Sequence, residues 1–402
     1  MIKNKNIIIV GQQAWDIEIG CNSKDIAIEF SKHNRVLYVN AALDRATKFR
    51  KKKDPKIQKR LNVINGTEDG IVQIADNLYN LYPDCMVESI NWINSTRIFD
   101  WLNKYNNKKF ARSILAATRK LGFDKFILFN DNDMFRSYYL KEYLKPTLAV
   151  YYSRDNMLGV NYWKKHGTLL EPRLISKSDV CIANSEYLSN QCKKYNPLSF
   201  FVGQGCDFSM FDNGNLEEPE DLKNIRRPII GYVGALLASR LDISLLENLS
   251  TKRPDWSFVL VGPEDEAFQD SLLHKMPNVH FTGGKDPSAI PAYINAFDIC
   301  MNPQYLNPIT IGNYPRKIDE YLVLGKPTIA TKTESMGLFK DYVALASNAS
   351  EYIEGIEQLL SSDNEELARQ RRAFALTHTW ENSIELISRA FEKAAAEKGI
   401  QL

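Results

Sequence analysis

Short apolar runs alternate with amphipathic stretches along most of this chain, and this alternation limits the possible fold more than any other feature. Between the first two runs lies NSKDIAIEFSKH (22–33), in which Ile26, Ala27 and Phe30 recur at helical spacing. Buried strands that alternate with amphipathic helices are typical of a parallel sheet covered by helices on both faces. The runs of the first half are NIIIV (6–10), RVLYV (35–39), KFILFN (125–130), LAVYY (148–152), DVCIAN (179–184) and SFFVG (199–203).

The alternation breaks at DFSMFDNGNLEEPEDLKNIRRP (207–228), which is acidic, contains Asn and Pro, and has no hydrophobic period. Because 402 residues exceed one ordinary core, we expect two domains. The predicted divisions are an N-terminal domain (1–210), a linker (211–228), a C-terminal domain (229–375) and a final amphipathic helix (376–402). The second series of runs is IIGYVG (229–234), SFVLVG (257–262), VHFTG (279–283), DICMNP (298–303), PTIAT (327–331) and YVALA (342–346).

The fold class predicted from this order is α/β, with two facing Rossmann-like, doubly wound domains. Open α/β sheets bind ligands outside the carboxyl ends of their strands. We therefore expect a ligand cleft between the two domains.

The composition excludes several classes of protein. A net charge of +2 does not suggest a general binder of nucleic acid. The six cysteines form no C-x-x-C pair and the five histidines form no H-E-x-x-H pattern, so no metal site is expected. No run approaches 18 apolar residues, and the apolar run before Gly11 is too short for a signal peptide. The expected location is cytoplasmic.

One segment, KFRKKKDPKIQKR (48–60), carries eight basic residues and a single acid. It follows the second predicted strand and therefore lies at the ligand-binding edge of the first domain. Two interpretations remain open. The segment is either a solvated loop or a patch that contacts an anionic membrane or a lipid-phosphate acceptor, which would place the protein at the inner face of the membrane.

In the second domain, GYVGALLASR places Gly231 and Gly234 at a strand end, before a helix expected near Leu241. Glycines there let a ligand approach the backbone, and a helix N-terminus favours phosphate. Arg240 adds a fork of donors for the same anion, and Gly262 repeats the pattern at the next strand end. The alternative is a tight turn with a surface arginine.

The stretch NYPRKIDEYLVLGKPTIAT (313–331) places Lys317 and Glu320 at the start of an otherwise apolar helix. Unpaired N–H groups of the first turn and the charge of Lys317 suit the phosphates of a nucleotide. Glu320 only accepts hydrogen bonds when ionised, which suits the two hydroxyls of a ribose. Asn307 and Thr310, in the loop NPITIGNYP before this helix, complete the donor-site candidates. The alternative for Lys317 and Glu320 is a surface ion pair at i,i+3 spacing.

Residues 281–331, FTGGKDPSAIPAYINAFDICMNPQYLNPITIGNYPRKIDEYLVLGKPTIAT, resemble the donor-nucleotide half of GT-B glycosyltransferases of the family 4 type (glycosyl transferases group 1). The branch most similar is that of teichuronic-acid and exopolysaccharide biosynthesis. SEYLSNQCKKY after DVCIAN and the closing HTWENSIELI extend the resemblance to most of the chain. The sequence departs from the family's E-x7-E motif, because Glu320 matches its second glutamate while Gly312 occupies the place of the first.

The resemblance implies a nucleotide-sugar donor in the second domain, an acceptor in the first, and a final helix that returns to the first domain. Asp155 lies where related enzymes have a Y-x-x-x-D type motif, and its carboxylate could deprotonate an acceptor hydroxyl or cap the next helix. Trp15 and Asp16, in the loop after the first strand, are the acceptor-binding candidates, although a structural role for Trp15 is equally open. The aromatic residues Tyr151, Tyr152, Tyr162 and Trp163 are assigned to the core in preference to a platform for a sugar.

The preferred function is a hexosyltransferase that moves a sugar from a nucleoside diphosphate to a hydroxyl of a glycan or lipid-linked acceptor in cell-surface polysaccharide synthesis. It is expected to need no cofactor or metal, since the sequence has no P-loop after a strand. The alternatives are a GT-B nucleotide-sugar epimerase and a non-catalytic nucleotide-sugar-binding partner of another transferase. An NAD-dependent oxidoreductase is disfavoured because the first turn, GQQAWDIEIG (11–20), lacks the required glycine spacing.

Overall fold

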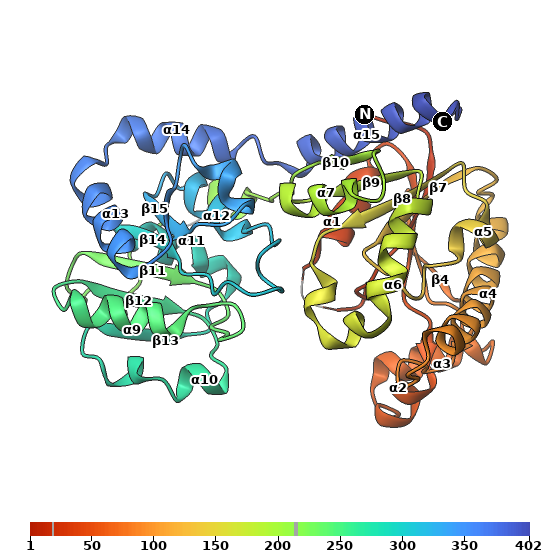
Figure 1. Cartoon of the computed structure of the whole chain (residues 1–402), viewed down its shortest axis with the longest axis horizontal. Coiled ribbons are helices and arrows are strands. Elements are labelled where there is room, and N and C mark those ends of the chain that lie inside the picture. Colours follow the sequence, from red (N-terminus) through yellow and green to blue (C-terminus); the bar gives the residue numbers. More distant parts are fainter. Residues whose placement is uncertain (18–19, 213–215) are drawn as a thin grey trace. The chain divides into compact units, whose positions relative to one another are not determined.

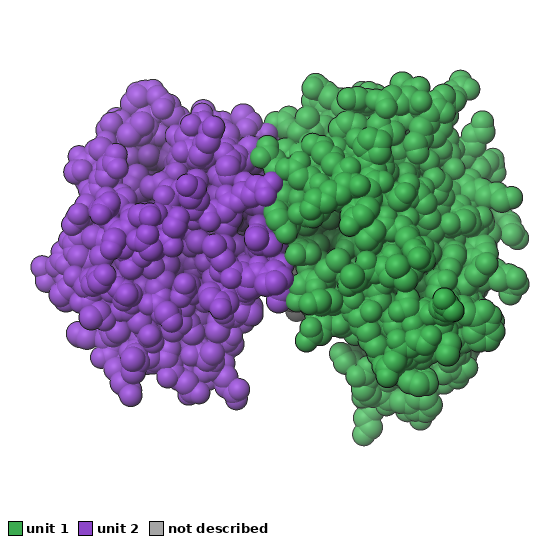
Figure 2. Space-filling model, in the orientation of Figure 1, with its two compact units in different colours: residues 1–203, 380–402 green, residues 204–379 purple. Residues whose placement is uncertain are grey.

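The computed structural model describes residues 1–17, 20–212 and 216–402 of the chain. These residues form two compact units, which Figure 2 colours separately. Unit 1 contains residues 1–203 together with 380–402, and unit 2 contains residues 204–379. The chain therefore passes from one unit to the other twice, at residues 203–204 and at residues 379–380.

Unit 1 is built on a mostly parallel sheet. Within its described residues the sheet has eight strands in the order β10-β9-β8-β7-β1-β2-β5-β4, and only β4 pairs in an antiparallel manner. Each run predicted for the first half forms a strand here, whereas β4 and β5 lie outside the predicted runs. The bounds are β1 Asn6–Val10, β2 Arg35–Val39, β4 Ile71–Ala75, β5 Leu78–Leu81, β7 Phe126–Asp131, β8 Leu148–Ser153, β9 Val180–Ala183 and β10 Ser199–Phe201, with a separate pair formed by β3 Leu43–Asp44 and β6 Met86–Val87.

Helices cover both faces of this sheet, because successive side chains of a buried strand point to opposite sides. In β1, Ile7 and Ile9 pack with residues of α1 and α15, while Ile8 and Val10 pack with residues of α4 and α5. The bounds are α1 Asn22–Ser31, α2 Arg45–Arg50, α3 Pro55–Ile64, α4 Thr96–Leu121, α5 Leu140–Leu144, α6 Asn161–Lys177, α7 Glu186–Lys193 and α15 Trp380–Lys398.

The final helix, α15, is part of unit 1 although it follows all of unit 2 in the sequence (Figure 1). Phe391 of α15 stacks on Phe30 of α1, with ring centroids 6.3 Å apart. Ile384 and Ile387 are fully buried in the same hydrophobic core. The apolar face of the predicted C-terminal helix is thus explained by packing against the first series of strands.

Unit 2 repeats the architecture with a wholly parallel sheet. Residues 229–346 form six strands in the order β13-β12-β11-β14-β15-β16, and each corresponds to a predicted run. Phe258 and Leu260 of β12 face α9 and α13, whereas Val259 and Val261 face α11 and α12. The bounds are β11 Ile229–Val233, β12 Ser257–Val261, β13 Val279–Gly283, β14 Ile299–Asn302, β15 Thr328–Thr331 and β16 Ala344–Ala346, with α8 Ser209–Asp212, α9 Ile243–Lys252, α10 Glu266–Gln269, α11 Ile290–Ala296, α12 Arg316–Val323, α13 Ala349–Ser362 and α14 Glu365–Ala375.

The predicted linker (211–228) differs from the structure. Residues 213–215 lie outside the described part of the chain, but the rest of the segment belongs to unit 2. Leu222 is fully buried in a hydrophobic core of that unit, and Asp221 accepts a hydrogen bond from the Tyr293 hydroxyl. Its polar composition therefore reflects a surface segment that is anchored at a few apolar positions.

Candidate active site

A pocket of about 220 Å³ opens in unit 2, next to the carboxyl ends of β11 and β14. This is the edge at which open α/β sheets bind ligands. Three of the donor-site candidates, Arg240, Thr310 and Lys317, line it together. The remaining lining residues are Tyr232, Leu241, Asn302, Gln304, Asn313, Tyr314, Pro315 and Arg316.

Lys317 lies in the first turn of α12 and extends over Gly234 at the end of β11. A Cβ atom on Gly234 would lie 2.1 Å from Cε and 2.7 Å from Nζ of Lys317. Gly234 also has a φ of 138°, which side-chain-bearing residues rarely adopt. Among the described residues the ammonium group has no acidic partner, and it lies 5.6 Å from the ring centroid of Tyr232. The glycine thus makes room for an uncompensated cation.

Two arginines add to this positive charge. Arg240 is exposed at the edge of the pocket, and no acidic side chain in the described part of the chain pairs with it. Arg316 Nε faces the Glu320 carboxylate without a well-aligned hydrogen bond, and Oδ1 of Asn313 on the same pocket wall is buried without a hydrogen bond. Forked guanidinium donors and a compact ammonium group suit the oxygens of a diphosphate.

Glu320 pairs with Arg316 and not with Lys317. The distance between Arg316 Nε and the Glu320 carboxylate is 3.3 Å, at i,i+4 spacing. Burial raises the pKa of Glu320, and the charges of Arg316 and Lys317 oppose this only in part. Glu320 does not line the pocket in the described structure, so its proposed contact with a ribose stays a prediction.

The other donor-site candidates have roles within the protein. Asn307 donates from Nδ2 to the Ser239 carbonyl at 2.8 Å, and its Oδ1 accepts the backbone N–H groups of Ile309 and Thr310. The Thr310 hydroxyl is buried and donates to the Tyr305 carbonyl at 2.5 Å. These bonds hold the loop before α12 in a fixed conformation, which shapes one wall of the pocket.

Gly262 has a packing reason for being glycine. Its φ is 152°, and a Cβ atom there would lie 2.0 Å from the carbonyl oxygen of Gly234. The glycine therefore lets the ends of β11 and β12 approach each other closely. Gly262 thus packs closely against the backbone of Gly234, and it is not itself among the residues that line the described pocket.

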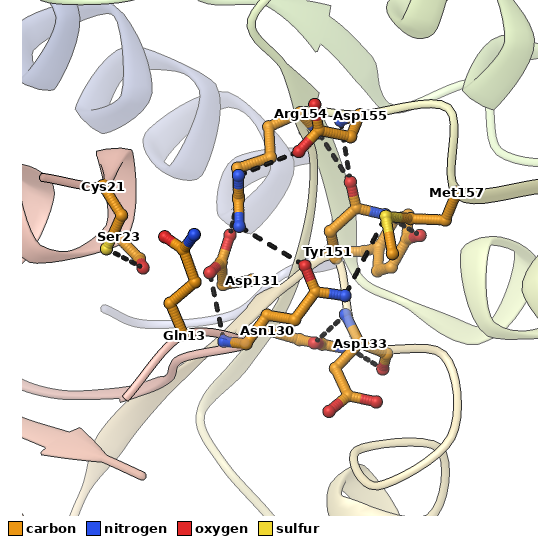
Figure 3. Close-up of polar contacts among 12 residues, drawn as sticks. Gln13, Cys21, Ser23, Asn130, Asp131, Asp133, Tyr151, Arg154, Asp155 and Met157 are labelled. Atoms are coloured by element: carbon orange, nitrogen blue, oxygen red, sulfur yellow. Dashed lines mark hydrogen bonds and ion pairs between the residues drawn. The ribbon is translucent and has the colours of Figure 1, made fainter. Parts of the chain in front are cut away.

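In unit 1, Asp155 belongs to a polar network at the carboxyl ends of β7 and β8 (Figure 3). Arg154 donates from Nε to Asp131 at 2.7 Å and from a terminal nitrogen to Asp155 at 2.8 Å. Burial lowers the pKa of Arg154, but the carboxylates of Asp131 and Asp155 outweigh it, so the net pKa is raised and the guanidinium stays charged. The side chain of Asp155 remains 37% exposed, which leaves it accessible to a ligand.

Asn132 fixes the backbone that carries Asp155. Its Oδ1 accepts the N–H groups of Arg154 and Asp155, each at 2.9 Å, and its Nδ2 donates to the Tyr151 hydroxyl at 3.0 Å. The residue has a φ of 53°, a left-handed conformation that asparagine tolerates better than most residues. The Tyr151 hydroxyl in turn donates to Glu171 at 2.6 Å.

Glu171 allows a prediction about pH. Burial raises its pKa, and the Tyr151 hydrogen bond lowers it only in part. The folded-state pKa of Glu171 therefore lies above its unfolded value of about 4.3. The protonated carboxyl contributes its full stabilisation of the folded state below that pH, and this stabilisation is lost as the pH rises through the folded-state pKa. Glu171→Gln accepts the same hydrogen bond without titrating. We expect its stability relative to wild type to increase from pH 4 to pH 8 in urea unfolding, and a difference that falls with pH would contradict this. The exposed control Glu392→Gln should show no such trend.

The two acceptor candidates are held by other residues of unit 1. Asp16 forms a forked ion pair with Arg60, with distances of 2.8 and 2.9 Å. Burial raises the pKa of Asp16, but the hydrogen bond and charge of Arg60 outweigh it and the net pKa is lowered. The Trp15 ring packs edge-on against Tyr38 at 5.1 Å, and the backbone N–H of Trp15 donates to Asn40 Oδ1. Both residues therefore have structural contacts, and their binding of an acceptor stays a prediction.

Comparison with known proteins places this geometry in a family. Residues 227–362 match the family described as glycosyl transferases group 1. The matched residues all lie within unit 2. The match covers the strands, the glycines and the helix that together form the pocket around Lys317, and it confirms the resemblance found in the sequence.

A curated relative extends the similarity. A Bacillus subtilis (strain 168) protein, assigned as the teichuronic acid biosynthesis glycosyltransferase TuaH, is 28% identical over 242 residues. The alignment covers 56% of this chain and 60% of the relative, so the chain spans less than two thirds of that relative's length.

Solved structures show the same fold over nearly the whole chain. Sucrose-phosphate synthase from Thermosynechococcus elongatus has a TM-score of 0.65 at 14% identity and covers 98% of this chain and 100% of its own. Anabaena HepE in complex with UDP has a TM-score of 0.64 at 14% identity, with coverages of 97% and 100%. A UDP-forming α,α-trehalose-phosphate synthase from Burkholderia vietnamiensis has a TM-score of 0.66 at 9% identity, with coverages of 98% and 100%. The predicted α/β fold class of two Rossmann-like domains is confirmed.

Unit 1 also has a pocket that the sequence did not indicate. Its volume is about 410 Å³, and it lies between α2, α4, the start of α6 and the loops after β6 and β7. Tyr162 and Trp163 line it, and Tyr162 is 55% exposed, so their assignment to the core is wrong for Tyr162. A signal was present, because both aromatic residues follow a strand end, where ligands bind in this fold.

The basic segment (48–60) is largely helical. It forms the end of α2 and the first part of α3, with Asp54 accepting the Lys56 N–H at the start of α3. Arg60 is buried in its pair with Asp16, whereas the lysines at 51–53 are exposed. The three exposed lysines therefore lie in the short turn between α2 and α3.

Proposed function

We propose that this protein is a glycosyltransferase that moves a sugar from a nucleoside diphosphate to a hydroxyl group of a glycan or lipid-linked acceptor. The observation that carries the proposal is the pocket around Lys317, in which three cations gather within a unit of the group 1 family. In the reaction, the bond between the sugar C1 and the phosphate oxygen breaks. A bond from C1 to the acceptor oxygen forms, the acceptor hydroxyl loses its proton, and the nucleoside diphosphate leaves with the bonding electrons.

The residues of unit 2 bind the donor and stabilise its leaving group. Lys317, Arg316 and Arg240 contact the diphosphate, and their effect increases as negative charge develops on it. We propose that these side chains supply the charge that a metal ion supplies in other transferases, so that no metal or cofactor is needed. UDP is the first nucleotide to test, because the solved structures with this fold include HepE in complex with UDP and a UDP-forming synthase.

The residues of unit 1 bind the acceptor. The exposed Asp155 carboxylate accepts a hydrogen bond from the acceptor hydroxyl and takes up its proton, while Arg154 holds the carboxylate in place. The similarity to TuaH supports a role in cell-surface polysaccharide synthesis. A search of the described residues finds no helix that could cross a membrane. We propose instead that the basic residues of 48–60 hold the protein at the inner face of the membrane.

Ligand-dependent thermal stability tests the donor site. Wild type is heated with UDP, GDP, ADP, CMP or NAD, in buffer that contains EDTA. One nucleoside diphosphate is expected to stabilise the protein, since a ligand at about 100 times its Kd adds about 2.7 kcal/mol. Arg240→Ala should lose most of this stabilisation, whereas Arg226→Ala, at an exposed position outside the pocket, should keep it. Stabilisation by NAD alone, or by none of the five ligands, would contradict the proposal.

A second assay separates transfer from the two alternatives. Wild type is incubated with the sugar donor of the nucleotide identified above, with and without a membrane extract as the source of acceptor. Incorporation of sugar into the extract supports transfer. A changed sugar without any acceptor would instead indicate an epimerase, and binding without turnover would indicate a non-catalytic partner.

A further inference from the structure

The pocket of about 410 Å³ in unit 1 has mostly apolar surface on its inner walls, although several polar residues also line it. Asn103 and Asn107 both donate to the Phe135 carbonyl, at 2.9 and 3.0 Å. Asn106 exchanges two hydrogen bonds, both of 2.9 Å, with the backbone of Glu88. Since these amides are already bonded within the protein, they do not require partners from a ligand.

The polar groups near α2 are likewise paired within the protein. Asp44 accepts hydrogen bonds from the Ser89 hydroxyl and from the backbone N–H of Thr47. The Glu88 carboxylate pairs with Arg45 at 2.6 Å. What remains for a ligand is the aromatic surface of Trp92, Tyr162 and Trp163, since Phe99, Phe110 and Phe135 line the pocket but are almost fully buried. Such a pocket suits a hydrocarbon group better than a sugar, which needs many hydrogen bonds.

The rim of the pocket is different. Trp92 and Tyr162 both line it, and they are 77% and 55% exposed. Arg50 is exposed at the same rim, and the described residues offer it no acidic partner. The rim can therefore bind an anionic group through Arg50, next to an interior that takes a hydrocarbon.

Phe49, next to Arg50 on α2, is an aromatic side chain that is 76% exposed. The exposed lysines at 51–53 follow α2 directly, and α2 and α3 protrude at one end of unit 1 (Figures 1 and 2). Tryptophan together with lysine and arginine is typical of protein surfaces at the membrane–water interface.

We propose that this pocket binds the hydrocarbon chain of a lipid phosphate, with the phosphate at Arg50 and the chain against the accessible aromatic side chains of the lining. The inference rests on the proposed function for its biological role, since the lipid phosphate would be part of the lipid-linked acceptor. The inference specifies an acceptor whose hydrocarbon chain, and not only its sugar, is recognised by the protein. The aromatic and basic residues around the rim hold the opening at the surface of the bilayer.

Binding of short alkyl phosphates tests the pocket directly. Hexyl, octyl and decyl phosphate, each kept below its micelle concentration, are titrated into the full chain, and tryptophan fluorescence reports occupancy because Trp92 and Trp163 line the pocket. Saturable binding is expected, with affinity increasing by up to about fourfold for each added methylene. Inorganic phosphate should not bind detectably at the same concentrations. Affinity that is independent of chain length would overturn the proposal.

Two variants locate the site. Ala46→Phe fills the pocket from α2 and should weaken decyl phosphate binding at least tenfold, while Ala396→Phe, exposed on α15, should not change it. Arg50→Met should reduce the preference for decyl phosphate over decanol about tenfold without weakening decanol binding. Because Arg50 is exposed, this second variant keeps the test valid even if Ala46→Phe does not fold. Wild-type affinity in both variants would refute the assignment.

The same titrations keep this inference separate from the proposed function. If a nucleoside diphosphate stabilises the protein but no alkyl phosphate binds, the transferase proposal stands and the lipid pocket is wrong. If decyl phosphate binds and no nucleotide does, the lipid site stands and the transferase proposal fails.

Discussion

Replacing Lys317 with methionine is expected to lower kcat for sugar transfer by about 100- to 1000-fold, or about 2.7–4 kcal/mol, as for other enzymes that lose one donor to a developing oxyanion. Methionine keeps the side chain as far as Cε over Gly234 and removes the ammonium group. The described structure offers the Lys317 ammonium no acidic partner, so its charge is available to the diphosphate. Initial rates over a range of donor concentrations give kcat and KM separately.

The matched control is Lys340→Met, the same substitution at an exposed position of unit 2 that does not line the pocket. It should leave both constants within about twofold of wild type. If Lys317→Met raises KM for the donor but leaves kcat unchanged, the ammonium group binds donor and transition state equally and does not stabilise the leaving group. If neither constant changes, Lys317 is not part of the donor site.

The fold could be predicted from the sequence because its signal is repeated many times. Every predicted apolar run became a strand, since a strand buried on both faces must be apolar throughout. The strands β4 and β5 could not be predicted in this way. Residues 73–75 of β4 are exposed at the edge of the sheet, where apolar side chains are not required. The linker prediction was misled by composition, because a few apolar residues, Phe211, Leu222 and Ile225, anchor an otherwise polar segment in a core.

Candidate site residues could be predicted only where the functional side chains lie together in one short segment of the sequence. Lys317 was found because a charged residue in the first turn of an apolar helix after a strand end is unusual. Its neighbour Glu320 was assigned to the ribose, yet Arg316, one turn before it, is the residue that its carboxylate contacts. Sequence spacing allows both the i,i+3 and the i,i+4 pair, and only the side-chain conformations decide between them.

The pocket of unit 1 could not have been found from any one segment. Its lining comes from five parts of the chain, among which Ala46, Ile90, Phe110, Phe135 and Trp163 are spread over more than 100 residues. Each of these residues by itself has the character of an ordinary core residue. The asparagines of α4 give no hint either, because only the structure shows that their amides are already bonded to backbone groups.

Replacing Arg154 with methionine is expected to destabilise unit 1 by about 3–5 kcal/mol, because it leaves the fully buried carboxylate of Asp131 without its cation. The remaining contact of that carboxylate is the backbone N–H of Gln12, at 3.1 Å. One neutral hydrogen bond does not replace the solvation that Asp131 lost on folding. Urea unfolding followed by circular dichroism measures the loss.

A second substitution shows whether the buried charge is the cause. In the double variant Asp131→Leu/Arg154→Met, both charges are removed, and most of the lost stability should return because an apolar pair of similar volume often replaces a buried ion pair without loss. Arg389→Met, which breaks an exposed pair with Glu385 on α15, should change stability by less than about 1 kcal/mol.

The outcome also bears on how Asp155 works. Arg154 forms ion pairs with both Asp131 and Asp155. Because its pair with Asp131 is buried, the arginine is held in place and fixes the position of the exposed Asp155 carboxylate. If the double variant recovers stability but not transfer activity, Arg154 is needed to position Asp155 and not merely to keep unit 1 folded. If stability and activity return together, the orientation of Asp155 is set by Asn132 and the backbone alone.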